Sequence, residues 1–486
     1  MHSSMPVRRK YSSEAQPTIP DEYDFLYPKF TLENPSKQSK VENVLRPLVL
    51  GRYSVFKIKE VFINELELGL QENPKRQSSL QMENTFLPGL PNGSENGEFL
   101  ALDLGGTNFR VIHVVINPSI SSPEYHIKYH SVPESTRLGP GEHLFDFLAS
   151  CIDDFLVEKE LREKRLNLGF CFSFPMTQKA LNKGILVSWT KSFNCTGVVG
   201  NDAVQMLKEA LNRKGVTSVN VVAVVNDTTG TLVKGAYIDH NCYIGMILGT
   251  GSNACYMEKV ANMPKFKDPA GQITEVVVDV EWGAFGDNGV LNFMKTEFDN
   301  AVDTNSLLVG SFTFEKMFAG KFLGELVRNV LVKLIREGLL FDGRASETLL
   351  TQQTFTTADV SAFETEDNIQ QEAQVLERLG YSHPTEDDLK IIRYACGVAS
   401  TRGALLVSIC TATLLERMNR TSCTVAIDGS LFKYHPEFHK MMEEFLRFMA
   451  PDRKFKLMLA EDGSGKGAGL VAAVATRLIE EGVIRQ

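Results

Sequence analysis

The sequence has no closely spaced pair of cysteines and no hydrophobic run long enough to cross a membrane. Its eight cysteines are scattered, and none forms the C-x-x-C pattern of a zinc or redox site. We expect several of them to be small buried hydrophobes in a reducing compartment, which favours a cytoplasmic protein. Apolar runs such as Leu470–Ala475 fall far short of the ~18 residues of a membrane span, so we expect no integral membrane contact.

Positive charge is also in short supply. Lys and Arg number 51 against 60 Asp and Glu, which gives a formal net charge of −9 and a pI of about 5.6. Such a chain has no overall attraction for a nucleic-acid backbone or an anionic membrane, so no nucleic-acid partner is expected. If the substrate is a polyanion, its charge must be bound locally by backbone N–H groups, a few basic side chains or a metal ion.

Three common catalytic motifs are missing. The chain has neither the G-x-S-x-G turn of the α/β-hydrolases nor the H-E-x-x-H pattern of zinc proteases. The stretch Gly463–Gly467 suggests a P-loop, but G-x-x-x-x-G-K-[ST] would need Gly at 460 and Ser or Thr at 467, where the chain has Ala460 and Gly467. His435 and His439 are four residues apart without an obvious third ligand, so we expect them at the surface rather than on a metal.

The length of 486 residues allows two or three domains. Residues 1–40 hold five of the 19 prolines and little apolar periodicity, which predicts a disordered tail. A mitochondrial transit peptide is the weaker alternative, because Glu14 and Asp21 closely follow the basic residues Arg8–Lys10 and such peptides avoid acids. Residues 71–97 are rich in Gly and Pro and predict a long loop.

The remaining chain alternates strand-like and helix-like segments, which predicts an α/β fold. The expected strands are 99–103, 109–116, 168–174, 219–225 and 244–248. The expected helices are 41–70, 143–158, 202–213, 314–337, 385–419, 437–449 and 467–481.

Two segments about 145 residues apart share one form, a strand, a Gly/Thr/Asn turn and a second strand. They are Leu102–Val114 and Ile247–Val260. Turns of this composition present N–H groups and hydroxyls with little side-chain bulk. They indicate either two similar halves that face one ligand or two unrelated hairpins, and the form alone does not decide between them.

A carboxylate ends the first of these strands and a polar turn follows it, in Asp103-Leu104-Gly105-Gly106-Thr107-Asn108-Phe109-Arg110. The glycines allow close backbone approach to an oxyanion, and Thr107, Asn108 and Arg110 add donors. Asp103 can hold the hydration shell of Mg²⁺. The alternative is an ordinary tight turn with Asp as turn-former.

A second carboxylate follows the apolar run Val219–Val225, in Asn226-Asp227-Thr228-Thr229-Gly230. In open α/β sheets, ligands bind at the carboxyl ends of such strands. The alternative is that Asn226 or Asp227 only caps the helix that starts at Thr228.

Two further motifs combine donors with a charge. Ser173-Phe174-Pro175 follows a strand, and Trp189-Thr190-Lys191 lies downstream, although Lys191 alone reads as a solvated lysine. Glu281 precedes Trp282 in a Gly-rich loop and suits a polyhydroxylated ligand, although alone it reads as a loop residue.

Two Gly-rich segments lie between an apolar segment and a helix. They are Ala426-Ile427-Asp428-Gly429-Ser430 and Glu461-Asp462-Gly463-Ser464-Gly465-Lys466-Gly467. Small residues at a helix start suit nucleotide contacts because the N–H groups there are unpaired. The alternative is a plain connecting loop.

In combination, these motifs resemble the eukaryotic hexokinase and glucokinase family. The resemblance covers roughly residue 41 to the C-terminus and rests on eight segments in order: LALDLGGTNFRV, LGFCFSFP, SWTKSF, VVNDTTGTL, ILGTGSNACYME, VEWGAFGD, GSLFKYHPEF and EDGSGKGAGL. Any one of these segments is weak, but eight in order are highly specific. The length resembles a single-unit hexokinase of about 50 kDa rather than the duplicated form.

The resemblance implies the two-domain, ribonuclease H-like α/β fold of sugar kinases, actin and heat-shock chaperones, with an interdomain active-site cleft. Residues 89–226 would form the small domain, joined by the returning C-terminal helix 463–486. Residues 41–88 and 227–462 would form the large domain. The two Gly/Thr hairpins would then be the phosphate-binding hairpins of this superfamily.

The resemblance also implies ATP-dependent phosphorylation of a hexose at the 6-hydroxyl, the first step of glycolysis, with ATP and Mg²⁺ as cofactors. Asp227 would be the general base and Lys191 would support it. The sugar site would be Ser173, Thr190, Lys191, Asn226, Asp227, Asn253, Glu281 and Glu315. The nucleotide site would be Asp103, Gly105, Gly106, Thr107, Asn108, Arg110, Thr250, Gly251, Lys321, Gly429, Ser430 and Ser464. No residue is expected to be a dedicated metal ligand.

The sequence departs from the family pattern at Thr356–Ser361, which puts Thr357 and Ser361 in doubt as nucleotide contacts. Glucose is the expected substrate, with mannose and fructose beside it, and domain closure on the sugar would exclude water. A weak association with the mitochondrial surface, and a monomer or a homodimer, both stay open. A non-catalytic sugar sensor and an ATP-driven chaperone on the same fold are the rival functions. Intact Asp227, Lys191, Asp103 and both hairpins argue against the sensor. The set Asn226-Asp227, Thr190-Lys191 and Glu281 argues against the chaperone, which would not need it.

Overall fold

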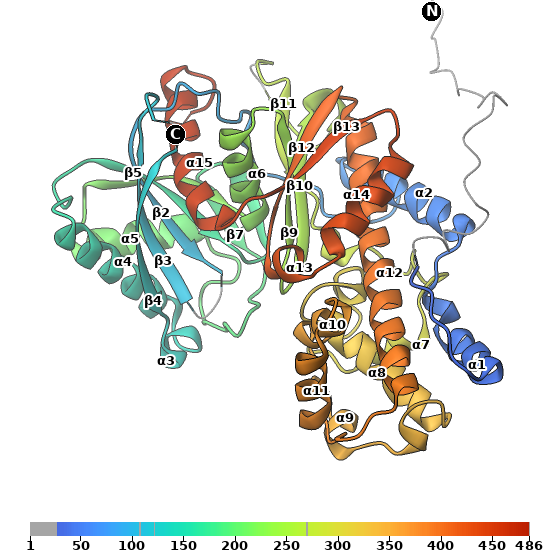
Figure 1. Ribbon diagram of the computed structural model, residues 1–486. Coiled ribbons are helices and arrows are strands. Elements are labelled where there is room, and N and C mark those ends of the chain that lie inside the picture. Colours follow the sequence, from blue (N-terminus) through green and yellow to red (C-terminus); the bar gives the residue numbers. More distant parts are fainter. Residues whose placement is uncertain (1–26, 106–107, 121, 269–270, 486) are drawn as a thin grey trace, which may run out of the picture.

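The computed structural model describes residues 27–105, 108–120, 122–268 and 271–485. Two mixed sheets form its frame, with helices between them and on both outer sides (Figure 1). This arrangement confirms the predicted α/β architecture.

The first sheet has the strand order β4-β3-β2-β5-β8. Its strands are β2 (Gly97–Leu104), β3 (Asn108–Ile116), β4 (Glu124–Ser131), β5 (Leu166–Phe172) and β8 (Val219–Val225). Strands β2, β3 and β4 are antiparallel neighbours, whereas β2, β5 and β8 run parallel. A separate hairpin consists of β6 (Met176–Ala180) and β7 (Lys183–Leu186).

The second sheet has the order β1-β11-β10-β9-β12-β13. Its strands are β1 (Glu83–Asn84), β9 (Cys242–Leu248), β10 (Ser252–Lys259), β11 (Glu275–Asp279), β12 (Ser422–Asp428) and β13 (Lys454–Leu459). Apart from β1, this sheet repeats the first, because three antiparallel strands are again followed by two parallel ones. The repeat decides the question that the two hairpins left open, in favour of two similar halves.

The helix that follows the last strand of each half crosses to the other half. Helix α6 (Asp227–Ile238) follows β8 but packs on β9 and β12, and α15 (Gly463–Glu480) follows β13 but packs on β2 and β5. The two helices also pack on each other between the sheets (Figure 1). Their contact is very close, since a Cβ on Gly467 would lie 1.9 Å from the carbonyl oxygen of Gly230.

The remaining helices lie on the outer sides of the two halves. Helices α3 (Glu134–Arg137), α4 (Gly141–Glu158) and α5 (Ala203–Lys214) lie on the side of the first sheet. The second sheet's side carries α1 (Pro35–Leu45), α2 (Arg52–Gly69), α7 (Glu297–Thr304), α8 (Leu323–Arg336), α9 (Glu347–Leu350), α10 (Thr357–Glu364), α11 (Ile369–Arg378), α12 (Glu386–Met418), α13 (Ser430–Tyr434) and α14 (Phe438–Met449). Short 3₁₀ turns are η2 (Arg46–Leu48), η3 (Val260–Asn262), η4 (Trp282–Ala284), η5 (Glu315–Met317) and η6 (Phe341–Gly343).

Helix α12 illustrates how local sequence sets an element. Thr385 caps its first turn in a reciprocal pair with Asp388, and Asn419 ends it in the left-handed conformation. Within the described chain, α12 is the one helix long and apolar enough to cross a membrane, and its apolar stretch is entirely buried in the protein. Several cysteines were expected to be buried, and all eight are.

Two predictions about the N-terminal part are wrong. The tail was expected to include residues up to 40, but Tyr27 and Leu32 are buried and α1 begins at Pro35, where the Asn34 side chain accepts from two backbone N–H groups. A single helix was expected over 41–70, but Pro47 follows Arg46 and the chain turns through η2 into α2. The disorder predicted for residues 1–26 lies outside the described residues.

Candidate active site

The centre of the site is the N-terminus of α6. The apolar strand β8 is buried through Val225 and ends at Asn226, whose side-chain oxygen accepts from the backbone N–H of Thr228 at 2.9 Å. Asn226 therefore caps the helix, and Asp227 is its first residue. The Asn226 side chain also makes a second interaction, since its Nδ2 donates to Glu281 Oε1 at 3.4 Å.

Lys191 reaches Asp227 from the other half of the molecule. Its Nζ lies 3.9 Å from Asp227 Oδ2, with side-chain exposures of 42% and 21%. Burial raises the pKa of Asp227 above its ordinary value, and the Lys191 ammonium opposes that rise. The carboxylate is thus both more basic than a free Asp and held next to a cation.

The loop that carries Lys191 is fixed by aromatic packing. Trp189 packs edge-on against Phe174 and stacks on Phe193, and its Nε1 donates to the carbonyl of Cys195 at 2.9 Å. Lys191 itself has φ of 55°, a conformation that a non-glycine residue adopts only when its surroundings impose it. The sequence motif around Trp189 therefore supplies the support for its lysine.

A second group of polar side chains comes from β10, β11 and the loop after β11. Asn253 Nδ2 donates to Asp279 Oδ1 at 2.7 Å, and the backbone N–H of Trp282 donates to Asn253 Oδ1 at 3.3 Å. Glu281 has φ of 54° and follows Asp279 by two residues. Burial and the neighbouring Asp279 raise the pKa of Glu281 well above its ordinary value.

Glu315 joins the same group through the second hairpin. Its Oε2 accepts from the backbone N–H of Ser252 at 2.9 Å, and burial raises the pKa of its carboxyl. Gly251 has to be small here, since a Cβ would lie 2.6 Å from Glu315 Oε2. The helix predicted over 314–337 is divided into η5 and α8. Between them, Gly320 packs on this hairpin, and its N–H donates to the carbonyl of Gly249 at 2.8 Å.

The structure thus brings six of the eight predicted sugar-site residues into one connected group. They are Lys191, Asn226, Asp227, Asn253, Glu281 and Glu315. Ser173 instead lies beside the first hairpin, where a Cβ on Gly105 would be 3.4 Å from its Oγ. The backbone of Thr190 accepts from the N–H of Phe193 at 3.1 Å, which closes the turn that holds Lys191.

The predicted nucleotide residues form two clusters. In the first, Arg110 forms an ion pair with Asp103 and donates to Asp462 Oδ1 at 3.0 Å. The Ser464 hydroxyl donates to Asp103 Oδ2 at 3.2 Å. Burial alone would lower the pKa of Arg110. The adjacent Asp103 and Asp462 carboxylates outweigh burial and raise that pKa, so the guanidinium stays charged. Asn108 begins β3, whereas Gly106 and Thr107 lie outside the described residues.

The second cluster surrounds the hairpin turn at Thr250. The backbone N–H of Lys321 donates to the carbonyl of Thr250 at 3.0 Å. Gly429 packs against the same turn from the end of β12, where a Cβ would lie 2.4 Å from the backbone of Leu248, and Ser430 begins α13 after it. Thr357 supports the turn through Gly320, because its hydroxyl donates to the carbonyl of Gly320 at 2.7 Å and Gly320 in turn donates to Gly249.

Asp428 links the two clusters and was not among the predicted site residues. It accepts from the N–H of Gly429 at 2.8 Å and from the N–H of Gly463 at 2.7 Å. Its position at the end of an apolar strand is the same signal that selected Asp103 and Asp227. Asp279, at the end of β11, carries that signal too and was also missed.

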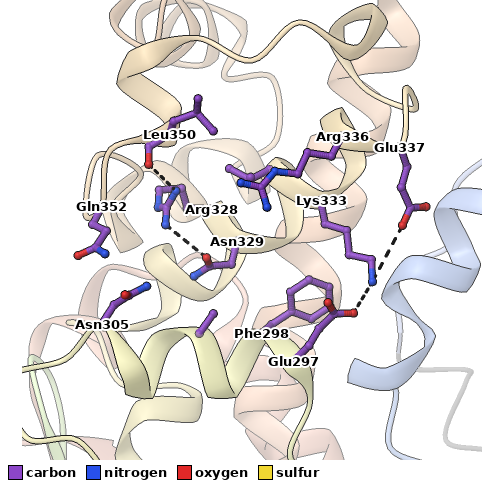
Figure 2. A pocket seen from close by; sticks show the side chains of 12 residues that line it. Glu297, Phe298, Asn305, Arg328, Asn329, Lys333, Arg336, Glu337, Leu350 and Gln352 are labelled. Carbon is purple, nitrogen blue, oxygen red and sulfur yellow. Dashed lines mark hydrogen bonds and ion pairs between the residues drawn. The ribbon is translucent and has the colours of Figure 1, made fainter.

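A surface cavity of about 510 Å³ lies elsewhere, between α7 and α8 (Figure 2). It contains none of the predicted site residues. Its charges are largely paired with one another, since Lys333 lies between Glu297 and Glu337, and Arg328 donates to Leu350 and Asn329. This cavity therefore contributes nothing to the arrangement described above.

Comparison with known proteins gives a consistent result. Two family models, both described as hexokinase, match residues 40–237 and 243–474. Hexokinase-2 from Rattus norvegicus and from Homo sapiens are each 42% identical to the chain over 465 residues, which is 94% of this chain and 50% of each relative. The chain thus spans about half the length of these curated relatives.

Solved structures agree with the sequence comparison. A hexokinase from Schistosoma mansoni complexed with glucose has a TM-score of 0.82 and 36% identity, covering 91% of this chain and all of that one. A second hexokinase crystal structure has a TM-score of 0.79 and 30% identity over the same shares. The predicted two-domain sugar-kinase fold is confirmed.

Proposed function

This chain belongs to the hexokinase family, and from that premise we propose that it transfers the γ-phosphoryl group of ATP to the 6-hydroxyl of a hexose. The observation that carries the proposal is the Asp227 carboxylate at the start of α6, with Lys191 Nζ 3.9 Å away and Asn226 and Glu281 beside it. Glucose is the proposed substrate, with mannose and fructose beside it.

Asp227 is the general base in this proposal. Its raised pKa makes it a better proton acceptor than a free Asp, and the role needs the ionised form. It takes the proton of the 6-hydroxyl as that oxygen attacks the γ-phosphorus, and the bond from phosphorus to the β-γ bridging oxygen breaks. A positioned base contributes about 10²–10⁴-fold, and alignment and charge stabilisation contribute most of the rest.

The hexose hydroxyls are bound by the polar group around Asp227. Asn226, Asn253, Glu281 and Glu315 offer amide donors and carboxylate acceptors, with Ser173 and Thr190 as hydroxyl partners. Lys191 balances the negative charge that gathers on the phosphoryl oxygens. The γ-phosphate and its neighbours are held by the N–H groups of the two hairpins, Gly105–Asn108 and Gly249–Gly251, with Arg110, Lys321, Gly429, Ser430 and Ser464 around them.

The residues present fit a magnesium ion that arrives with the nucleotide. Within the described ranges, no group of three or more His, Cys, Asp or Glu side chains could enclose a metal ion. Asp103 Oδ2 is already bonded to Arg110 and Ser464. Mg²⁺ takes few protein ligands and keeps water and phosphate oxygens, so Asp103 would hold it through that shell. When bound, the ion neutralises the phosphate charge.

The proposed domains follow the expected division. Residues 89–226 with 463–486 form the small domain, and 41–88 with 227–462 form the large one, to which the start of α1 at Pro35 is added. Lys191 belongs to the first and Asp227 to the second, so a rotation that closes the domains would change their distance and exclude water from the site. A cytoplasmic location, a monomeric or homodimeric state and a weak contact with the mitochondrial surface complete the proposal.

The test is a coupled assay of the purified chain with ATP, Mg²⁺ and each hexose in turn, with phosphate located on the product by NMR. We expect hexose 6-phosphate from glucose. The variant Asp227→Asn, which keeps the size of the side chain, should lose about 10²–10⁴-fold in kcat with little change in glucose affinity. Activity of this variant within a few-fold of the wild type would show that Asp227 is not the base, and no turnover by the wild type on any hexose would end the proposal.

A further inference from the structure

Asp279 is buried in the site but has no role in the proposed reaction. It ends β11 and is 4% exposed. Its Oδ1 accepts from Asn253 Nδ2 at 2.7 Å and lies 3.5 Å from the hydroxyl of Thr228. Burial of an ionised carboxyl is unfavourable unless neighbouring groups stabilise it or it takes up a proton.

The partners of Asp279 form a closed ring of side chains. Thr228 Oγ1 lies 3.0 Å from Asn226 Oδ1, and Asn226 Nδ2 lies 3.4 Å from Glu281 Oε1. Glu281 returns to Asp279 through a hydrogen bond between the two carboxyl groups. Asn226 and Glu281 are proposed sugar contacts, and Asp279 interacts with Glu281 directly and with Asn226 through Thr228.

A hydrogen bond between two carboxyl groups needs a proton. The charged and titratable groups around the pair are mostly acidic, with Asp227 on α6 and Glu83 opposite Asp279 on β1. Cys255, the register partner of Asp279 on β10, stays a neutral thiol, because burial raises its pKa. The described cation of the site, Lys191, pairs with Asp227.

Burial therefore dominates the pair. It raises the pKa of Asp279 to about 7, and burial with Asp279 raises the pKa of Glu281 further above its ordinary value. Both carboxyls therefore favour the protonated form more than a free Asp or Glu does. Two adjacent buried carboxylates would repel each other strongly once the proton of their hydrogen bond is lost.

We propose that Asp279 is a positioning residue of the sugar site, which shares one proton with Glu281 and holds Glu281 and Asn253 toward the hexose. This inference rests on the proposed hexose phosphorylation. Loss of the shared proton separates the two carboxylates and turns their partners away from the sugar. Hexose affinity therefore falls as the pH rises above neutrality, whereas Asp227 controls the loss of turnover at low pH.

The first test compares the wild type with Asp279→Asn. An Asn at 279 still accepts from Asn253 and donates an N–H to an ionised Glu281, so the ring no longer needs a proton. We expect the glucose KM of the wild type to rise up to about tenfold per pH unit above neutrality, and that of the variant to stay level between pH 6 and 9. Parallel KM profiles for the two proteins would overturn the inference.

Two further variants separate positioning from general damage. Asp279→Ala leaves the Asn253 amide without its acceptor. Its glucose KM should therefore be about tenfold above the wild-type value at pH 7 and should not change with pH. Asp279→Asn should have the wild-type KM at pH 7. Asp287→Asn is the matched control, since Asp287 lies in the same loop and accepts from the backbone N–H groups of Phe312 and Thr313. It should follow the wild-type pH profile, and a wild-type KM for Asp279→Ala would contradict the inference.

Two readouts do not depend on turnover. The chain has two tryptophans, Trp189 and Trp282, and each adjoins a proposed sugar-site residue, so intrinsic fluorescence can follow glucose binding directly. Urea unfolding tests the pair itself. Because a carboxyl with a raised pKa takes up a proton on folding, wild-type stability should fall relative to Asp279→Asn as the pH rises from about 4 to about 7.

The outcomes are distinguishable. An unfolding difference that does not change with pH overturns the proton-sharing pair even if the enzyme is active. A wild type that shows the pH-dependent difference but phosphorylates no hexose supports the pair and removes the proposed function.

Discussion

The contact between α6 and α15 gives the sharpest test of how this fold positions Asp227, the proposed base. Gly467 on α15 faces Gly230 on α6, and an added Cβ would lie 1.9 Å from the carbonyl oxygen of Gly230. An ordinary carbon contact begins near 3.4 Å, so Gly467→Ala has to separate the two helices by roughly 1.5 Å along this direction. Neither side can relieve the overlap by a rotamer change, because the opposing atom belongs to a backbone.

The displacement reaches the active site because Gly230 lies three residues after Asp227 in the same helix. Overpacking costs about 1–3 kcal/mol when side chains can adjust, and more is expected against a backbone. A misplacement of about 1 Å can cost on the order of 10²-fold in rate. We therefore expect Gly467→Ala to remain folded at 20 °C with a lower midpoint of unfolding and a kcat about 10²-fold below the wild type.

Gly469→Ala is the control for destabilisation alone. It lies on the same helix, but its Cβ would lie 2.4 Å from Val114 Cγ2 on the first sheet. The opposing atom is a side-chain methyl of the first sheet rather than backbone of α6, so the strain falls away from Asp227. This variant should lose stability but keep the kcat of the wild type per folded molecule. If Gly467→Ala kept a kcat within a few-fold while circular dichroism showed a native fold, the helix contact would not position Asp227.

Three further predictions follow from the charges. Lys191→Met removes the cation that opposes the effect of burial on the pKa of Asp227. That pKa should therefore rise further, and the acid limb of the kcat profile should move to higher pH. An acid limb that does not move would show that Lys191 does not set the pKa of Asp227. Asp299→Ala should cost about 3–5 kcal/mol in urea unfolding because Arg402, which is fully buried, loses its ion-pair partner, and Asp299→Ala with Arg402→Met should recover part of that loss. Chelation of Mg²⁺ with EDTA should abolish turnover but leave the fluorescence response to glucose, and loss of both would point to a structural metal.

Sequence patterns predicted the elements whose signals are local. The apolar run Val219–Val225 is strand β8 with the same bounds, and the Thr385 and Asn419 caps bracket α12. Polar residues directly after buried strands singled out Asp103, Asn226 and Asp227 as candidates, because strand ends meet at one edge of a sheet. Asp279 followed the same pattern after β11, so the signal was present and the residue was overlooked.

Long-range contacts explain the predictions that failed. The apolar spacing of 314–337 is helical despite Gly320 and Gly324, and the docking of Gly320 on Gly249 breaks the helix. His435 was expected at the surface, yet it is buried and lies 3.0 Å from the Ser400 hydroxyl and 3.3 Å from a Glu364 oxygen. Periodicity reports only which face of a segment is apolar, and both cases depend on partners distant in sequence.

The crossing of α6 and α15 also constrains how the proposed domains could close. Asp227 begins one of these helices and Ser464 lies in the first turn of the other, so one backbone contact fixes the proposed base and part of the proposed phosphate site together. Points near a rotation axis move least. If the sheets rotate about this crossing, the distance between Asp227 and Ser464 changes little, whereas Lys191, on a loop of the other sheet's domain, approaches or leaves Asp227. The long 3.9 Å contact between Lys191 and Asp227 is therefore the distance that closure on a hexose should shorten.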